Sequence, residues 1–425
     1  MTGTLRFLLH SNSYAPEVIG VGKYNGEMCE WLAARGHEVR VVVPPPFYPH
    51  WRVMEGHSAW AYRRERVGGV EVWRCPTWVP AEPSSMKRIA HLASFATSSF
   101  LTMVRQARWR PDVVMVTGPP ALCFPGAWLT ARLSGAKLWL HVLDFELDTA
   151  LQLGMLSTGG SVRRFLYRAE YLLLRRADRV STISEKMLQR LLNKGVANHR
   201  GYLFPNWADT DLIRPSARDN EMRRKLGVGS EQVLVMYAGN MGEKQGLELV
   251  LEAADKLRER PMIQFAMIGE GAAREKLEWT ARQRKLSNVR FLPVQPLDLL
   301  PFVLAAGDIH LVVQRRDVAD FVMPSKLTNI LAAGRASVAT VDPGTAVFEV
   351  LRGYDCGITV LPESATELTS GIVTLAVDAR MRQRLGQNAR RYAESYLKKD
   401  TILANFEGSL QQLVKTRGKE TLAVL

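Results

Sequence analysis

Residues 323–335, MPSKLTNILAAGR, combine several features that can hold an anion. Pro324 is a residue type that often starts helices, and Ser325 and Lys326 follow it in the predicted first turn. The N–H groups of a helix N-terminus carry partial positive charge and bind phosphates, and the Lys326 ammonium would add a charge-assisted hydrogen bond. The segment predicts a phosphate site, although an ordinary capped surface helix would have a similar sequence.

Two glycine-rich turns lie upstream of this segment. The first, GNMGEKQG at 239–246, follows an apolar run and places its glycines and Lys244 where a diphosphate could sit. The second, GEG at 269–271, also follows an apolar run. Because glycine has no side chain, the backbone N–H groups of such turns can approach a ligand closely. The two turns predict one shared site at the carboxyl ends of neighbouring strands.

A third glycine-containing turn lies near the N-terminus and includes Gly20 and Gly22. It precedes an amphipathic pattern, so its N–H groups could also meet an anion at a helix start. The spacing is neither the GxGxxG of dinucleotide-binding folds nor the GK[ST] of a P-loop. A plain tight turn therefore remains the alternative.

These turns separate short apolar runs that alternate with helical patterns along the chain. The runs are 5–10, 38–43, 113–117, 137–142, 179–183, 234–238, 264–268, 289–292, 308–313, 337–341 and 357–360. Most are uniformly apolar, which is typical of parallel strands covered by helices on both faces. The alternation predicts an α/β fold with two doubly wound parallel sheets.

The length of 425 residues accommodates two domains. Turn residues near Pro205 mark the expected boundary, which gives an N-terminal domain at 1–205 and a C-terminal domain at 206–395. Residues 396–425 are expected to form a helix and tail that could pack back on the N-terminal domain. Ligands of such domains bind beyond the carboxyl ends of the strands.

The formal net charge is +14, and most of the surplus lies in the first half. Up to Pro205 there are 26 basic and 15 acidic residues, against 30 and 27 afterwards. Nucleic acid and an anionic membrane are the usual partners of such a surface, and simple solubility is the alternative. The uncharged apolar stretch 89–104 is shorter than the ~20 residues of a spanning helix. The four cysteines form no CxxC pair, which favours a reducing cytoplasm.

Several motifs in the same order resemble the retaining glycosyltransferases of family four, which have the GT-B fold. Within that family they are most similar to the colanic-acid-type exopolysaccharide transferases of bacteria. The motifs are GVGKY (20–24), WLAARGHEV (31–39), PNWAD (205–209), IGEG (268–271), PSK (324–326) and AAG (332–334). The resemblance extends over essentially the whole chain.

The resemblance implies two Rossmann-like domains that face each other across a cleft. It also implies transfer of a hexose, with retention, from a UDP- or GDP-sugar held mainly by the C-terminal domain, without a metal or another cofactor. By position, Lys326 and the Ser325 N–H would hold the diphosphate, and Asn329 would bind a ribose hydroxyl. The remaining residues implied in donor binding are Gly20, Gly22, Gly239, Asn240, Lys244, Gln245, Gly269 and Gly271.

The sequence departs from the family pattern at three of these positions. Asn329 and Phe321 stand where the family has the two glutamates of its E-x7-E motif, with Asp320 beside the latter. Asn240 replaces the usual arginine, and Gln245 takes the lysine position with Lys244 next to it. The identity of the donor and of the phosphate ligands therefore stays open.

Asp144 and Glu146 are the candidate catalytic carboxylates, because they follow the predicted strand 137–142. One of them could orient or partly deprotonate the acceptor hydroxyl, while a helix N-cap is the alternative role for Asp144. Asp209 and Asp211 read as a DxD metal motif, but the family has a similar sequence at this junction with a structural role. We therefore expect no metal site.

The basic first half is expected to face the inner surface of the plasma membrane. Arginines at 163, 164, 168, 175 and 176 alternate with apolar residues in a predicted helix, as in interfacial helices. Buried core helices with solvated ends are the alternative. The surface reading predicts a peripheral membrane protein whose acceptor is a sugar linked to polyprenyl diphosphate.

Two other functions are alternatives to this one. A nucleotide-sugar 2-epimerase of the same fold needs an acidic and histidine cluster that the sequence does not show. A basic nucleic-acid-binding protein would interleave its positive residues with aromatic residues in a recognisable module, and no such module is present. A cytoplasmic glycosyltransferase of exopolysaccharide synthesis is the function the sequence favours.

Overall fold

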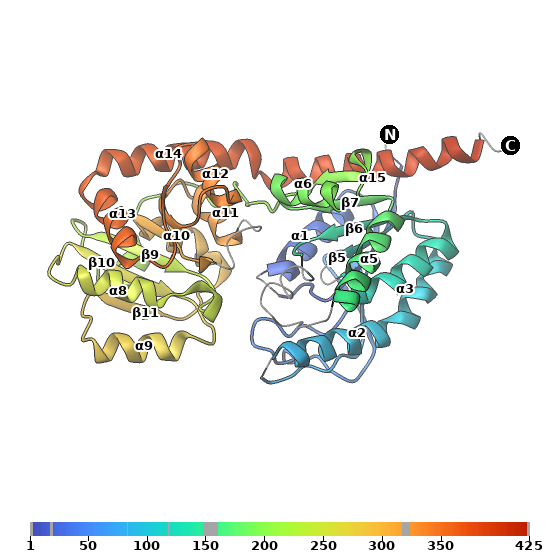
Figure 1. Ribbon diagram of the computed structural model, residues 1–425, viewed down its shortest axis with the longest axis horizontal. Coiled ribbons are helices and arrows are strands. Elements are labelled where there is room, and N and C mark those ends of the chain that lie inside the picture. Colours follow the sequence, from blue (N-terminus) through green and yellow to red (C-terminus); the bar gives the residue numbers. More distant parts are fainter. Residues whose placement is uncertain are drawn as a thin grey trace. The chain divides into compact units, whose positions relative to one another are not determined.

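The computed structural model describes residues 3–17, 20–82, 84–117, 120–145, 147, 160–316 and 324–422. The chain forms two compact units (Figure 1). The N-terminal unit contains residues 1–204 and 403–425, and the C-terminal unit contains residues 205–402. The return of the chain to the N-terminal unit thus begins at Leu403, seven residues after the expected boundary at 395/396.

The N-terminal unit is built on an eight-stranded sheet in the order β3-β4-β2-β1-β5-β6-β7-β8. All neighbouring strands are parallel except β3 and β4, which are antiparallel. The strands are β1 (Arg6–Ser11), β2 (Glu38–Val43), β3 (Arg63–Val67), β4 (Val70–Arg74), β5 (Val113–Thr117), β6 (Lys137–Val142), β7 (Arg179–Thr182) and β8 (Gly201–Leu203). The helices are α1 (Gly20–Ala34), α2 (Ser85–Gln106), α3 (Pro120–Ser134), α5 (Gly160–Arg176), α6 (Glu185–Asn193) and α15 (Lys399–Leu422), of which α15 begins in the C-terminal unit.

The C-terminal unit contains a six-stranded, fully parallel sheet in the order β11-β10-β9-β12-β13-β14. The strands are β9 (Val233–Ala238), β10 (Ile263–Ile268), β11 (Val289–Leu292), β12 (Ile309–Val312), β13 (Ala336–Thr340) and β14 (Ile358–Val360). The helices are α7 (Glu221–Lys225), α8 (Glu248–Lys256), α9 (Arg274–Gln283), α10 (Leu300–Ala306), α11 (Ser325–Ala332), α12 (Ala346–Gly353), α13 (Ala365–Val377) and α14 (Ala379–Tyr396).

Strand β9 shows why these sequences form parallel sheets. Val235 and Tyr237 point into an apolar core on one face of the sheet. Leu234 and Met236 point into a separate core on the other face. Because successive side chains of a strand alternate between faces, a strand covered on both sides must be apolar at nearly every position. This packing fixes where the strand ends and where its loop residues can meet a ligand.

Candidate functional site

The first two glycine turns meet in the C-terminal unit as the sequence predicts. Strands β9 and β10 are paired so that Ala238 lies beside Ile268, which places Gly239 next to Gly269. The Gly239 N–H donates a hydrogen bond to the Ile268 carbonyl at 2.9 Å. A Cβ on Gly269 would lie 1.9 Å from the Gly239 carbonyl oxygen, so no other residue fits there without movement.

The two turns continue side by side beyond this first contact. The Met241 N–H donates to the Glu270 carbonyl at 2.8 Å, and the Ala273 N–H donates to the Met241 carbonyl at 2.9 Å. A Cβ on Gly271 would lie 2.5 Å from that same Met241 oxygen. Gly269 and Gly271 both have a φ of 149°, which a residue with a side chain rarely adopts. Both glycines are therefore required by backbone contact between the turns.

Gln245 has a structural contact within the first turn. Its side-chain oxygen accepts a hydrogen bond from the Gly242 N–H at 3.0 Å, at the start of a short 3₁₀ turn. Asn240 is exposed, and its carbonyl accepts a hydrogen bond from the Tyr237 hydroxyl at 2.6 Å. The side chain of Lys244 is not among those the structure describes. A phosphate-binding role for these three residues stays a prediction.

Lys326 lies beside the glycine turns. Its ammonium is 3.6 Å from the position that a Cβ on Gly239 would take. The ammonium donates a hydrogen bond to the Tyr237 hydroxyl at 2.8 Å and lies 4.2 Å from the centre of that ring. No carboxylate of the described residues forms an ion pair with it within 4 Å. Desolvation by burial lowers the pKa of Lys326 to about 7, because the ammonium has exchanged water for an aromatic ring.

Helix α11 begins at Ser325, directly before this lysine. Its N-cap residue is Pro324, whose side chain makes no capping hydrogen bond. Among the described residues, no side chain caps this helix end, and an anion there could accept from the N–H groups of Ser325 and Lys326. The carboxyl end of the helix is closed by Gly334 with a φ of 64°. Lys326, the N-terminus of α11 and the glycine turns form one site suited to a diphosphate.

The remaining positions of the predicted donor site are those of the E-x7-E motif. Asn329 is partly exposed on α11, one turn after Ser325, and its side chain has no hydrogen bond among those of the described residues. Asp320 and Phe321 lie outside the described residues. The ribose-binding role of Asn329 therefore stays a prediction.

The candidate residues of the N-terminal unit have different surroundings. Gly20 is exposed at the start of α1, with a φ of 64°. Gly22 is buried inside α1, where a Cβ would lie 2.6 Å from the Cβ of Glu17. Asp144 is exposed, two residues after the end of β6, and Glu146 lies outside the described residues. The buried position of Gly22 gives it a packing role, and its proposed contact with the donor is untested.

The DxD sequence is engaged in structural contacts. Asp209 accepts a hydrogen bond from the Lys399 ammonium at 2.5 Å and another from the Leu212 N–H at 2.9 Å. Asp211 forms an ion pair with Arg214 at 3.2 Å. Within the described part of the chain, no three His, Cys, Asp or Glu side chains are grouped as metal ligands would be.

Comparison with known proteins agrees with this arrangement. Residues 20–207 match a model of the glycosyl transferase 4-like domain, and residues 218–392 match a model of glycosyl transferases group 1. The chain is 44% identical, over 95% of its length and 98% of the relative, to the protein named colanic acid biosynthesis glycosyl transferase WcaI of Escherichia coli K12. The chain is a family-4 glycosyltransferase. Its likeness to WcaI makes it one of the colanic acid biosynthesis type.

Solved structures show that this glycosyltransferase has the GT-B fold. Sucrose-phosphate synthase from Thermosynechococcus elongatus aligns with a TM-score of 0.71 and 16% identity, over 97% of this chain and all of that one. Anabaena HepE, solved in complex with UDP-glucose, aligns with a TM-score of 0.66 and 15% identity, over 99% of this chain and all of that one. The predicted fold and family are therefore confirmed.

Sequence reasoning missed Tyr237, the partner of Lys326. A phenol in an otherwise apolar strand, two residues before the first glycine turn, was the available signal. The contact between Tyr237 and Lys326 could not be predicted from the sequence, because the two residues are 89 positions apart in the chain.

Proposed function

We propose that this glycosyltransferase takes its sugar from a UDP- or GDP-linked donor bound by the C-terminal unit. The observation that carries the proposal is the Lys326 ammonium, which has no carboxylate partner among the described residues and lies 3.6 Å from the Cβ position of Gly239. The uncapped N-terminus of α11 adds N–H donors beside it. The UDP-glucose complex of Anabaena HepE supports a nucleotide-sugar donor for this fold.

The same groups would stabilise the leaving nucleotide. Negative charge develops on the diphosphate as the glycosidic bond lengthens, and preorganised N–H groups and an ammonium lower the energy of that charge. We propose that the transfer proceeds with retention and needs neither a metal ion nor another cofactor. In this proposal Asp144 or Glu146 orients the acceptor hydroxyl.

The acceptor is proposed to be a sugar on polyprenyl diphosphate at the cytoplasmic face of the membrane, in synthesis of a colanic-acid-like exopolysaccharide. Similarity to WcaI supports the pathway. Helix α5 supports the surface, because Leu174 is its one fully buried residue in the part of the helix that the structure describes. This exposure contradicts the reading of α5 as a core helix.

The exposed residues of α5 have the composition of a membrane-surface helix. Phe165 is 70% exposed, Val162 48% and Leu172 46%. Arg163, Arg164, Arg168, Arg175 and Arg176 lie on the same helix. Apolar side chains can enter the headgroup region while arginines contact anionic lipids. No helix among the described residues is long and apolar enough to cross a bilayer.

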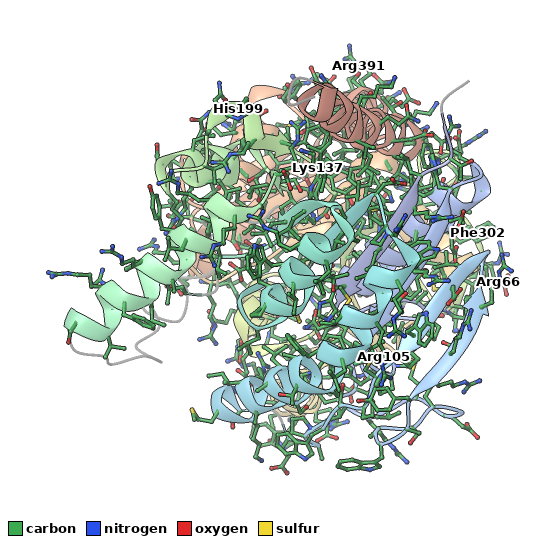
Figure 2. The ribbon with its side chains drawn as sticks, turned by 90° about the vertical axis from the view of Figure 1, so that its right-hand side faces the viewer. Arg66, Arg105, Lys137, His199, Phe302 and Arg391 are labelled. Carbon is green, nitrogen blue, oxygen red and sulfur yellow. The ribbon has the colours of Figure 1, made fainter. Side chains whose placement is uncertain are left out.

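Helix α2 fits a membrane surface less well than α5. Phe95 and Met103 are fully buried, while Met86, Ile89 and Leu101 are exposed. The apolar stretch 89–104 therefore supplies core contacts with one side and exposed apolar groups with another. Figure 2 labels Arg105, which is exposed at the end of this helix.

A thermal-shift screen of the purified chain against UDP, GDP and their sugars tests the donor proposal. A matching nucleotide raises the melting temperature, since it binds the native state only. The same nucleotide should give a much smaller shift with Lys326→Ala. If no nucleotide stabilises the wild type, or if the variant responds equally, the donor site is not where we propose it.

A further inference from the structure

A pocket of about 640 Å³ lies in the C-terminal unit at the amino ends of β12 and β13. Its wall contains one carboxylate, Asp308, and five arginines. The arginines are Arg218, Arg335, Arg382, Arg390 and Arg391. The pocket is therefore strongly positive, although the C-terminal half of the chain carries only a small basic surplus.

Part of this charge is used to hold the fold together. Asp308 is buried and accepts hydrogen bonds from Arg218 at 2.7 Å, from Arg223 at 3.0 Å and from the Leu234 N–H at 2.8 Å. Arg390 donates to three backbone carbonyls and to Glu394. The one carboxylate of the wall is thus paired with Arg218 and Arg223, and it forms no ion pair within 4 Å with the other arginines of the wall.

Arg335, Arg382 and Arg391 form no ion pair within 4 Å with any carboxylate of the described residues. Arg335 donates through Nη2 to the Ser216 carbonyl at 2.6 Å, while its Nε is buried without a partner. Arg382 donates to the carbonyls of Leu375 and Ala376. Desolvation, the largest cause, lowers the pKa of Arg335; the charge of Asp308 raises it, and the nearby Arg218 and Arg223 lower it. Because the five arginines of the wall outnumber its one carboxylate, a bound anion would stabilise them.

This pocket is separate from the donor site. Asp308 and Arg335 directly precede β12 and β13, whereas the glycine turns follow the carboxyl ends of β9 and β10. The eight-residue helix α11 has Lys326 in its first turn and leads at its other end to Gly334 and Arg335. Its length of about 12 Å separates the two places.

We infer that the arginine pocket binds a phosphorylated ligand through Arg335, Arg382 and Arg391. Guanidinium groups match the geometry of phosphate oxygens and can donate two parallel hydrogen bonds. The volume is that of a small-molecule site and exceeds the size of a single phosphate. The phosphate group can belong to a soluble metabolite or to a lipid headgroup, and the experiment separates these sources.

Calorimetric titration of the full chain with inorganic diphosphate tests the inference. We expect Arg335→Gln combined with Arg382→Gln to weaken binding at this site at least tenfold. Arg391→Gln should weaken it about threefold; Arg391 is exposed on α14 and labelled in Figure 2, so this variant keeps the fold even if the pair does not. Arg380→Gln is the matched control, since it removes one charge from the same helix outside the pocket.

A second measurement identifies the source of the phosphate. Vesicles of phosphatidylcholine with phosphatidic acid are compared with soluble glycerol phosphate. A vesicle affinity about threefold lower in Arg391→Gln identifies a lipid headgroup, and an affinity about threefold lower for glycerol phosphate alone identifies a soluble ligand. Diphosphate binding that is equal in wild type, Arg391→Gln and Arg380→Gln, or that is wholly lost in Lys326→Ala, overturns the inference.

Discussion

The ammonium of Lys326 donates a hydrogen bond to the hydroxyl of Tyr237 at 2.8 Å, so the partner of this charge is a neutral group. A lysine paired with a carboxylate would have its charge compensated before any ligand arrived. Here the positive charge is oriented by a hydrogen bond and a ring face, and it stays available to an anion. Lys326 can therefore be fixed in place and still be able to bind a diphosphate.

Replacement of this lysine should affect activity far more than folding. Lys326→Ala removes a charge-assisted hydrogen bond worth ~1.5–3 kcal/mol, so we expect transferase activity to fall at least tenfold. The exposed Lys276, which pairs with Glu248 in the same unit, provides the control variant Lys276→Ala. Steady-state kinetics with circular dichroism of both variants measures the effect. Near-wild-type kinetics of Lys326→Ala would falsify the assignment of the donor site.

The pH dependence of donor binding follows from the same lysine. Its pKa in the free protein is lowered to about 7, so it is an ammonium below that pH and an amine above it. A diphosphate favours the ammonium, and donor affinity should therefore fall as the pH rises through about 7. Above that pH, binding should take up a proton, which calorimetry in two buffers of different ionisation heat detects. The proton uptake should be absent in Lys326→Ala; equal uptake there would exclude Lys326 as its source.

The close contact between the two glycine turns can be tested by adding one methyl group at Gly269. Gly269→Ala places a Cβ 1.9 Å from a backbone oxygen at a φ of 149°, so the two turns must separate. We expect a loss of about 2 kcal/mol or more in the free energy of unfolding, together with loss of nucleotide binding. Gly353→Ala is the control, because nothing lies within 4 Å of its Cβ position. Equal stability of the two variants would show that the turns can adapt.

Neutralising the arginines of α5 should weaken membrane association. Replacing Arg163, Arg164 and Arg168 with glutamine is expected to move the protein from the membrane fraction to the soluble fraction, at ~1 kcal/mol per charge. The control removes three exposed charges from the other unit, at Arg282, Arg284 and Lys285. Sedimentation with anionic vesicles measures both. A similar response of the two triple variants would indicate general electrostatic attraction and not a surface on α5.

Glu407 connects α15 to the rest of the N-terminal unit. It accepts hydrogen bonds from Arg35 at 2.7 Å and from His37 Nε2 at 2.9 Å. Nε2 is the donor, because His37 Nδ1 already accepts from the Leu5 N–H at 3.1 Å. Glu407→Gln should lower the free energy of unfolding by about 1–3 kcal/mol, measured by chemical denaturation. The exposed Glu259→Gln serves as control, and an equal change in both would remove any special role of Glu407.

The parallel strands were predictable because their burial leaves a signal in the sequence. All eleven predicted runs correspond to strands within one or two residues at each end. Strands β3, β4 and β8 were missed. Strand β3 gives the weakest signal, since RRERV has exposed charged residues and no apolar alternation. It is an edge strand that pairs antiparallel with β4 through Gly68 and Gly69, and this Gly-Gly turn was the one available sign of a hairpin.

The parts of the site that follow directly from the order of strands along the chain were predictable. Glycines after parallel strands must lie at one edge of the sheet, which is why the pairing of Gly239 with Gly269 could be foreseen. The bond between Gln245 and its own turn could not, because a glutamine can bind a ligand or the backbone with equal chemistry. The arginine pocket was also missed, since its residues come from four separated segments of the chain.

The burial of Phe406 has a consequence for biosynthesis. This ring stacks on Phe204 with a centroid distance of 4.3 Å and contacts Trp139 at 5.0 Å, inside a unit whose other residues end at 204. The ribosome therefore has to translate the whole of the second unit before the first can be completed. The first two hundred residues leave the exit tunnel with an unfilled apolar site, so the N-terminal unit is completed only after Phe406 has been synthesised.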